Sequence, residues 1–164
     1  MPLILGTLTD DLVKIYNKGK KGNPSPATVG LRTAGAYLQY CTNGQNAGVG
    51  SFTAMPGSSQ LGTDLADVYM KVPTATGMIT AANMATAFDK CLSTFLSVHQ
   101  TTIVTAPGKG ALQMELMELL SAPKGHASLY ATALARALNN YTMSAIVIGV
   151  IPDTPGIPFT GPIS

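Results

Sequence analysis

Apolar residues recur every three to four positions along most of this chain, which is the spacing of one face of a helix. Thr9, Ser25 and Thr80 stand before three such stretches as candidate N-caps, and Pro26 follows Ser25 at a favourable first-turn position. The prediction is a mainly α fold, a small helical bundle, in which no internal repeat is identified. The predicted helices cover residues 9–19, 25–43, 63–71, 79–98 and 109–122, with a last helix from about residue 126. The glycine-rich residues 42–63 predict a long surface loop.

The end of the last predicted helix allows two interpretations. Its helical spacing continues to Ile148, but the run from Ala145 to Ile151 is apolar on every side. A β-strand over residues 146–151 is the alternative, because the run is short and rich in β-branched residues. Both interpretations bury this segment.

The C-terminal residues 152–164 are rich in proline and glycine, which exclude a helix and an interior strand. They nevertheless carry Ile157, Phe159 and Ile163, which a solvated linker would lack. We therefore expect two parts, a helical body over residues 1–151 and an extended C-terminal arm over residues 152–164.

The 164 residues predict one soluble domain, of which only 11% are charged, against about 25% in an ordinary domain. Low surface charge indicates a protein packed among other subunits, because interface cores are depleted of charge. The net charge of +2 is too small to indicate nucleic-acid binding. The longest apolar run, residues 145–151, is too short to span a membrane, and no basic start of a secretory signal is present. Cys41 and Cys91 are expected as small buried side chains in a protein made in a reducing cytoplasm.

The residues supply no catalytic, cofactor-binding or metal-binding motif. The segment TAPGKGAL (105–112) is similar to a phosphate-binding loop, but Ile103 replaces the first glycine and Gly110 replaces the hydroxyl residue after the lysine. The nucleotide interpretation therefore fails. His99 and His126 lie at predicted helix ends, outside any metal-ligand spacing.

The charged residues indicate solvated or partner-contacting faces. The lysine cluster of residues 18–21 ends the first helix, where the helix dipole favours cations. Two carboxylate pairs have i, i+3 spacing on predicted helices and no nearby histidine: Asp64 with Asp67, and Glu115 with Glu118. Methionines at helical spacing predict core positions for Met84, Met114, Met117 and Met143.

The C-terminal run AIVIGVIPDTPGIPFTGPI and the segment ITAANMATAF resemble parts of small structural proteins of tailed bacteriophages, in particular baseplate and neck components. The resemblance covers the C-terminal half of the chain and rests mainly on the tail. It implies a helical bundle without enzymatic activity, located in the virion and made in the host cytoplasm.

The resemblance implies a role in assembly. The body would pack with copies of itself or with other virion structural proteins in a homo-oligomeric or hetero-oligomeric ring. Ile157, Phe159 and Ile163 would anchor the arm in a neighbour's groove and its backbone would pair with a strand edge, since proline preorganises an extended chain. The segment MPLIL would serve as a second arm. No cofactor, metal, small-molecule substrate, membrane or direct nucleic-acid contact is expected.

Three alternatives stay open at this point. The tail folds back over its own core and contacts no neighbour. The chain is a head decoration protein, which binds the outside of a shell. The chain is a small soluble enzyme with its site at residues 42–63, which requires carboxylates or a histidine close to that loop; the sequence places none there.

Overall fold

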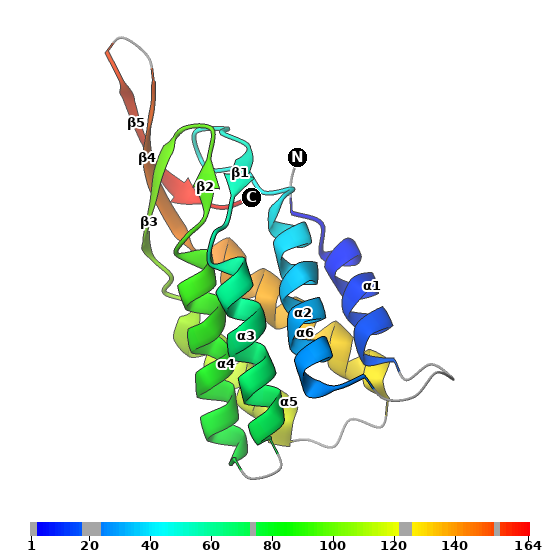
Figure 1. Cartoon of the computed structure of the whole chain (residues 1–164). Coiled ribbons are helices and arrows are strands. Elements are labelled where there is room, and N and C mark those ends of the chain that lie inside the picture. The colour runs from blue at the N-terminus through cyan, green and yellow to red at the C-terminus, as the bar shows by residue number, and fades with distance from the viewer. Residues whose placement is uncertain (1–2, 18–23, 73–74, 122–125, 153–154) are drawn as a thin grey trace.

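The computed structural model describes residues 3–17, 24–72, 75–121, 126–152 and 155–164, and the protein is mainly helical (Figure 1). The helices are α1 (Leu5–Tyr16), α2 (Pro26–Cys41), α3 (Ser58–Lys71), α4 (Gly77–Leu92), α5 (Lys109–Ser121) and α6 (Ala127–Ser144). The strands are β1 (Phe52–Ala54), β2 (Leu96–Ser97), β3 (Gln100–Thr105), β4 (Ile146–Ile151) and β5 (Ile157–Pro162). The lysine cluster of residues 18–21 lies outside the described residues.

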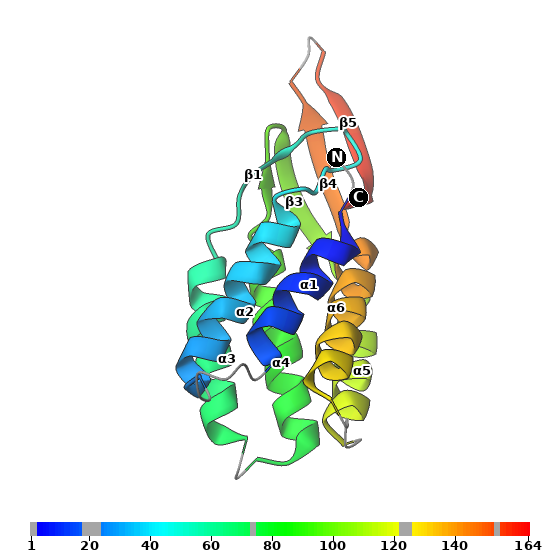
Figure 2. The same cartoon turned by 90° about the vertical axis from the view of Figure 1, so that its right-hand side faces the viewer.

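Successive helices run in opposite directions and form a closed ring, because each contacts the next in the chain and α6 contacts α1. All the described strands gather at one end of this ring, where α1 begins and the chain's C-terminus lies (Figures 1 and 2). We call this region the β end. It consists of the described residues that follow α2, α4 and α6, namely 42–57, 93–108 and 145–164.

The chain consists of three copies of one unit, a helical hairpin followed by a β segment, so the absence of a repeat in our prediction was wrong. The repeats cover residues 5–54, 58–105 and 109–164. Their second helices align without gaps as AGAYLQYC, ATAFDKCL and ARALNNYT, and the same five positions of this octet are buried each time. Their first helices align as LTDDLVKIY, LGTDLADVY and LQMELMELL, and the leucines at the first and fifth positions are buried in each. The core is therefore built three times from one pattern.

The strand pairings between repeats follow the same rule. Phe52 pairs with Ser97 and Ala54 with Leu96, with a register shift between the two pairs. At the corresponding places between β3 and β4, Ile103 pairs with Val147 and Thr105 with Ile146, again with a register shift. One bulged junction is thus used twice.

The C-terminus makes the third junction, between repeat 3 and repeat 1. The Gln45 N–H donates to the Ser164 carbonyl over 2.8 Å, and the Ser164 N–H donates back to the Gln45 carbonyl over 2.9 Å. Gln45 occupies the place that Leu96 and Ile146 hold in the other two repeats. The tail therefore closes a pseudo-threefold ring within one chain.

Two tyrosine hydrogen bonds repeat around this ring. The Tyr40 hydroxyl donates to Asn139 Oδ1 over 2.7 Å, and the Tyr141 hydroxyl donates to Asp89 Oδ1 over 2.8 Å. In both bonds the tyrosine stands at the seventh position of its octet, and the acceptor stands at the fifth position of the octet in the preceding repeat. Around the ring, repeat 3 precedes repeat 1. At the third place the two residues are Cys91 and Leu38, so donor and acceptor are both replaced by apolar groups.

The helix boundaries confirm one predicted cap and correct two. Ser25 caps α2, since its hydroxyl accepts the Thr28 N–H over 3.2 Å. Thr9 lies inside α1, where its hydroxyl donates to the Leu5 carbonyl over 2.9 Å, and the helix begins four residues earlier than predicted. Thr76, not Thr80, caps α4.

Three other predictions need correction, and the structure decides one alternative that the sequence left open. The predicted loop 42–63 contains β1 and the first turn of α3, and the predicted helix 79–98 ends at Leu92, before β2. The strand interpretation of residues 146–151 is the one the structure has, and α6 ends at Ser144. Met84 is buried as predicted, but the other three candidate core methionines are exposed: Met114, Met117 and Met143.

Burial raises the pKa of every tyrosine hydroxyl and of both cysteine thiols, with Cys91 reaching about 12. The ordinary values are 10.0 for tyrosine and 9.0 for cysteine. The pKa values of these groups are higher in the folded than in the unfolded chain. Their contribution to the free energy of unfolding is therefore fully present at pH below the ordinary pKa values. The contribution is lost as pH rises further, since the unfolded chain releases protons that the folded chain retains.

We therefore expect the free energy of unfolding to fall as pH rises above the ordinary cysteine value of 9.0. Urea unfolding at a series of pH values, at constant ionic strength, measures this slope. Tyrosinate absorbance is expected to appear together with unfolding. A gradual tyrosine titration near the ordinary pKa in the folded protein would contradict the burial of the hydroxyls.

Candidate functional site

Among the described residues, charged side chains are confined to the helices. In the residues that the structure describes, every Lys, Arg, Asp and Glu lies on a helix, and the β end carries none. A solvated surface normally displays charged side chains, whereas the core of a protein interface is depleted of them. The β end therefore has the composition of a contact surface.

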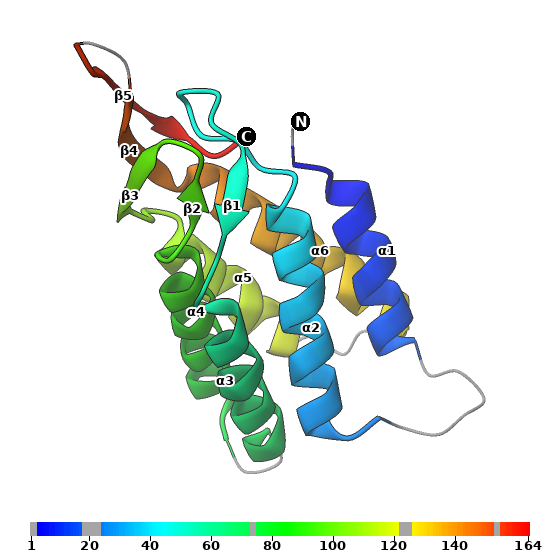
Figure 3. The same ribbon diagram turned by 45° about the horizontal axis from the view of Figure 1, so that its top comes forward.

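The hairpin of β4 and β5 is where repeat 3 departs from the other two. Both of its strands are six residues long, whereas repeat 1 has the three-residue β1 and repeat 2 has the two-residue β2 and the six-residue β3. The hairpin projects beyond the rest of the β end (Figures 1 and 3). β5 is an edge strand in the order β3-β4-β5, which is where proline is tolerated in a sheet. The added length is not needed to close the ring, so it is available for another purpose.

One side of this hairpin, which we call the front face, is apolar and open. Register places Ile148, Val150 and Pro158 on it, with Thr102 of β3 beside them. Val150 is 41% exposed, and Ile148 is exposed to a similar degree. The front face borders a cavity of about 590 Å³, whose opposite wall comes from repeat 2 and includes Leu96, Ser97 and Val98.

The other side, which we call the back face, is covered only in part. The Phe159 ring lies on Gly48, where an added Cβ would be 2.7 Å from it, and a Cβ added at Gly161 would be 2.5 Å from the Ala47 Cβ. Farther out, Ile151 and Ile157 pair across the strands on the same face, and Ile157 is 52% exposed. The glycine-rich loop thus covers the inner half of the back face and leaves the outer half open.

The three predicted anchor residues have different fates. Ile163 is 1% exposed and belongs to the chain's own core, so its assignment to a neighbour's pocket is corrected. Phe159 packs against that core from a half-buried position. The backbone of residues 157–162 pairs with β4 of the same chain, and pairing of the other edge of β5 with a neighbour's strand stays a prediction. Ile157 is the anchor that stays available, and its contact with a partner stays a prediction.

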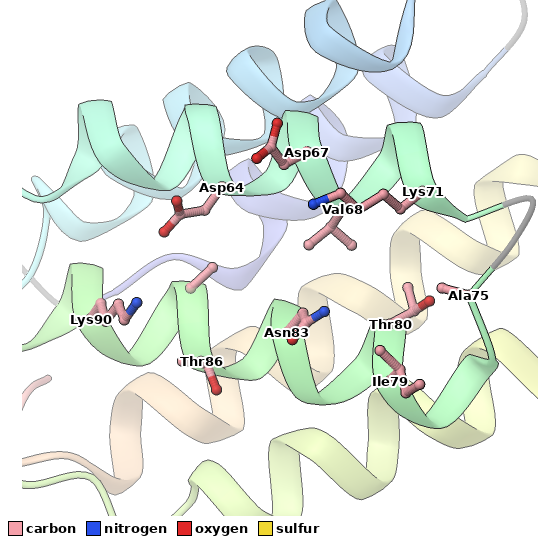
Figure 4. A pocket seen from close by; sticks show the side chains of 11 residues that line it. Asp64, Asp67, Val68, Lys71, Ala75, Ile79, Thr80, Asn83, Thr86 and Lys90 are labelled. Carbon is pink, nitrogen blue, oxygen red and sulfur yellow. The ribbon is translucent and has the colours of Figure 1, made fainter.

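The two predicted carboxylate pairs line grooves between helices. Asp64 and Asp67 of α3 face Asn83 and Lys90 of α4 across a groove of about 260 Å³ (Figure 4). Equivalent positions line a groove of about 340 Å³ between α1 and α2, and one of about 490 Å³ between α5 and α6. An acid stands at the same place in each: Asp11, Asp64 and Glu115. Because all three hairpins have a groove, the grooves follow from the repeat, and no histidine is among the described residues that line them.

The structure brings a histidine to the glycine-rich loop, which the sequence did not predict. A Cβ added at Gly50 would lie 2.5 Å from His99 Cδ2, and His99 Nδ1 is buried without a hydrogen-bond partner among the described residues. The nearby Ser97 hydroxyl donates to the His99 carbonyl and accepts from Asn46 Nδ2 over 2.6 Å. Asn46 Oδ1 in turn accepts the Gly50 N–H over 2.8 Å. These bonds hold the loop against β2.

Comparison of the chain with protein-family models, with curated proteins and with solved structures gives no match. Within the described residues, no group of three or more His, Cys, Asp or Glu is placed to hold a metal ion. Among the helices described, none combines the length and the hydropathy that crossing a membrane requires.

Proposed function

We propose that this chain is a structural assembly subunit of a tailed-phage particle, in the tail, baseplate or neck. The observation that carries the proposal is the β end, which exposes aliphatic side chains and displays no charge in its described residues. The resemblance of the C-terminal run to small phage components agrees with this role. The proposed partners are other virion structural proteins.

In this proposal the two ends of the molecule have separate tasks. The helical ring is the body, closed by the chain's own C-terminus through Ile163 and Ser164. The projecting hairpin makes the contact with neighbouring subunits by burying its apolar faces. Contact is therefore made by a preformed sheet rather than by an exchanged arm, and little chain entropy is lost on assembly.

Replacing Val150 with aspartate is expected to reduce incorporation into particles at least about tenfold, because a carboxylate buried in an apolar contact loses its hydration. Mass spectrometry of gradient-purified particles measures the ratio of this chain to other particle proteins. Met114→Asp is the matched control, since Met114 is 68% exposed on α5, away from the β end. Absence of the unaltered chain from particles would refute the function, and equal incorporation of both variants would refute the contact surface.

A further inference from the structure

The strand β5 has a long edge that no other described strand covers. In the order β3-β4-β5 it pairs only with β4, whereas β3, at the opposite edge, also contacts β2. The neighbouring strand β4 has the apolar sequence IVIGVI, which is rich in β-branched residues. A free edge on such a sheet is a template on which strands of other chains can pair. The edge therefore needs protection if the chain is not to grow into an open-ended sheet.

The hydrogen bonds of Ser164 show which backbone groups of β5 point to this edge. Just as β3 lies between β2 of its own repeat and β4 of the next, β5 lies between β4 and Gln45 of repeat 1. The N–H and the carbonyl of Ser164 both bond to Gln45, so they point away from β4. Backbone groups of successive residues in an extended strand point to alternate sides. The backbone groups of residues 158, 160 and 162 therefore face the free edge.

Two of these three residues are prolines. Because Pro158 and Pro162 have no N–H, the edge offers three carbonyls but only one donor, the N–H of Thr160. The residues whose N–H groups face β4 all have one: Ile157, Phe159 and Gly161. The prolines thus stand where they leave the pairing with β4 intact and remove donors from the outer edge alone.

We propose that Pro158 and Pro162 block the free edge of β5 against the addition of a strand from any other chain. A strand that paired there would bury its own carbonyls opposite both prolines without a donor, which is costly. This inference argues against the pairing with a neighbour's strand that the sequence suggested, and leaves contact through side chains. It concerns the free chain and does not depend on the proposed function.

Restoring the two donors tests the block. The double variant with Pro158→Thr and Pro162→Thr keeps a residue suited to a strand at both positions. Its apparent association constant, measured by sedimentation velocity, is expected to rise at least about tenfold, because each added hydrogen bond contributes roughly fivefold. The matched control carries Pro152→Thr and Pro155→Thr, which add two N–H groups outside β5. This control is expected to sediment like the unaltered chain, and circular dichroism checks that both double variants fold.

Amide exchange of the unaltered chain, followed by NMR at low concentration, tests the backbone directions without any substitution. The N–H groups of Phe159 and Gly161 are expected to exchange slowly, and that of Thr160 between them is expected to exchange fast. Slow exchange at Thr160 would mean that the edge is already covered, and fast exchange at the other two would mean that they do not face β4. Either result would overturn the inference, as would equal sedimentation of the two folded double variants.

These outcomes leave the proposed function to its own test. The presence of the unaltered chain in particles is measured independently of the edge. If the edge proves open to strands while the chain is found in particles at a fixed ratio, the assembly role stands, and strand pairing with a neighbour is again a way to perform it.

Discussion

Replacing Gly30 with alanine is expected to lower the free energy of unfolding by about 2–3 kcal/mol or more, which is the upper range for overpacking a core. A Cβ at this position would lie 2.4 Å from the Ala66 nitrogen and 2.8 Å from its Cα. Both atoms are backbone, so α3 as a whole must move away from α2 to make room. These two helices make the most extensive contact in the ring, and their separation would disturb the junction between repeats 1 and 2.

Gly35→Ala is the matched control for this variant. Gly35 lies on the same helix, and an added Cβ there meets no atom within 4 Å. Alanine at an exposed helical position stabilises by roughly 0.5–1 kcal/mol relative to glycine. The two identical substitutions are therefore expected to have opposite signs in urea unfolding. Equal and favourable effects of both would mean that α2 and α3 do not approach as closely at Gly30 as the structure has them.

The periodic spacing of apolar residues predicted most of the helical body, because a helix that buries one face repeats its apolar positions. The Ser25 cap was predicted for the same local reason, since a hydroxyl before a first-turn proline acts within one turn. The start of α1 was not predicted correctly, because the N-cap residue Ile4 has no side chain that could cap the helix. The hydroxyl of Thr9 instead donates to a carbonyl within the helix.

The threefold repeat escaped prediction although its signal is present in the sequence. At the fourth octet position the three repeats carry Tyr37, Phe88 and Leu138, which differ in volume and polarity but fill equivalent places in the core. The β segments that follow differ in length, so a fixed period fails at the points where the chain turns. When the second helices alone are compared, each copy is marked by two buried alanines, at the first and third positions of the octet.

The role of the tail was not predictable from its local composition. A segment with prolines and scattered aliphatic residues has the same appearance whether it binds a neighbour or its own chain. The deciding contact joins Gln45 to Ser164, which lie far apart in the chain, and no local pattern reports it. The prolines are compatible with β5 because it is an edge strand.

Truncating Ile163 to alanine is expected to lower the free energy of unfolding by about 2–5 kcal/mol, the usual range for a buried isoleucine. Ile163 is almost fully buried, and its Cγ2 would lie 3.1 Å from a Cβ added at Gly44 of repeat 1. The side chain therefore holds repeat 3 against repeat 1 at the one junction of the ring where the repeats are not consecutive in the chain. Urea unfolding monitored by circular dichroism measures the loss.

Ile157→Ala removes the same atoms at the start of β5, six residues before Ile163, where the side chain is half exposed. It is expected to change the free energy of unfolding by no more than about 0.5 kcal/mol, as surface substitutions do. The pair thus separates two roles for one tail: Ile163 closes the ring, and Ile157 is left for a neighbour. If both variants proved equally stable to urea, the tail would not be part of the chain's own core, and an arm docked on another subunit would again be the better account of its apolar residues.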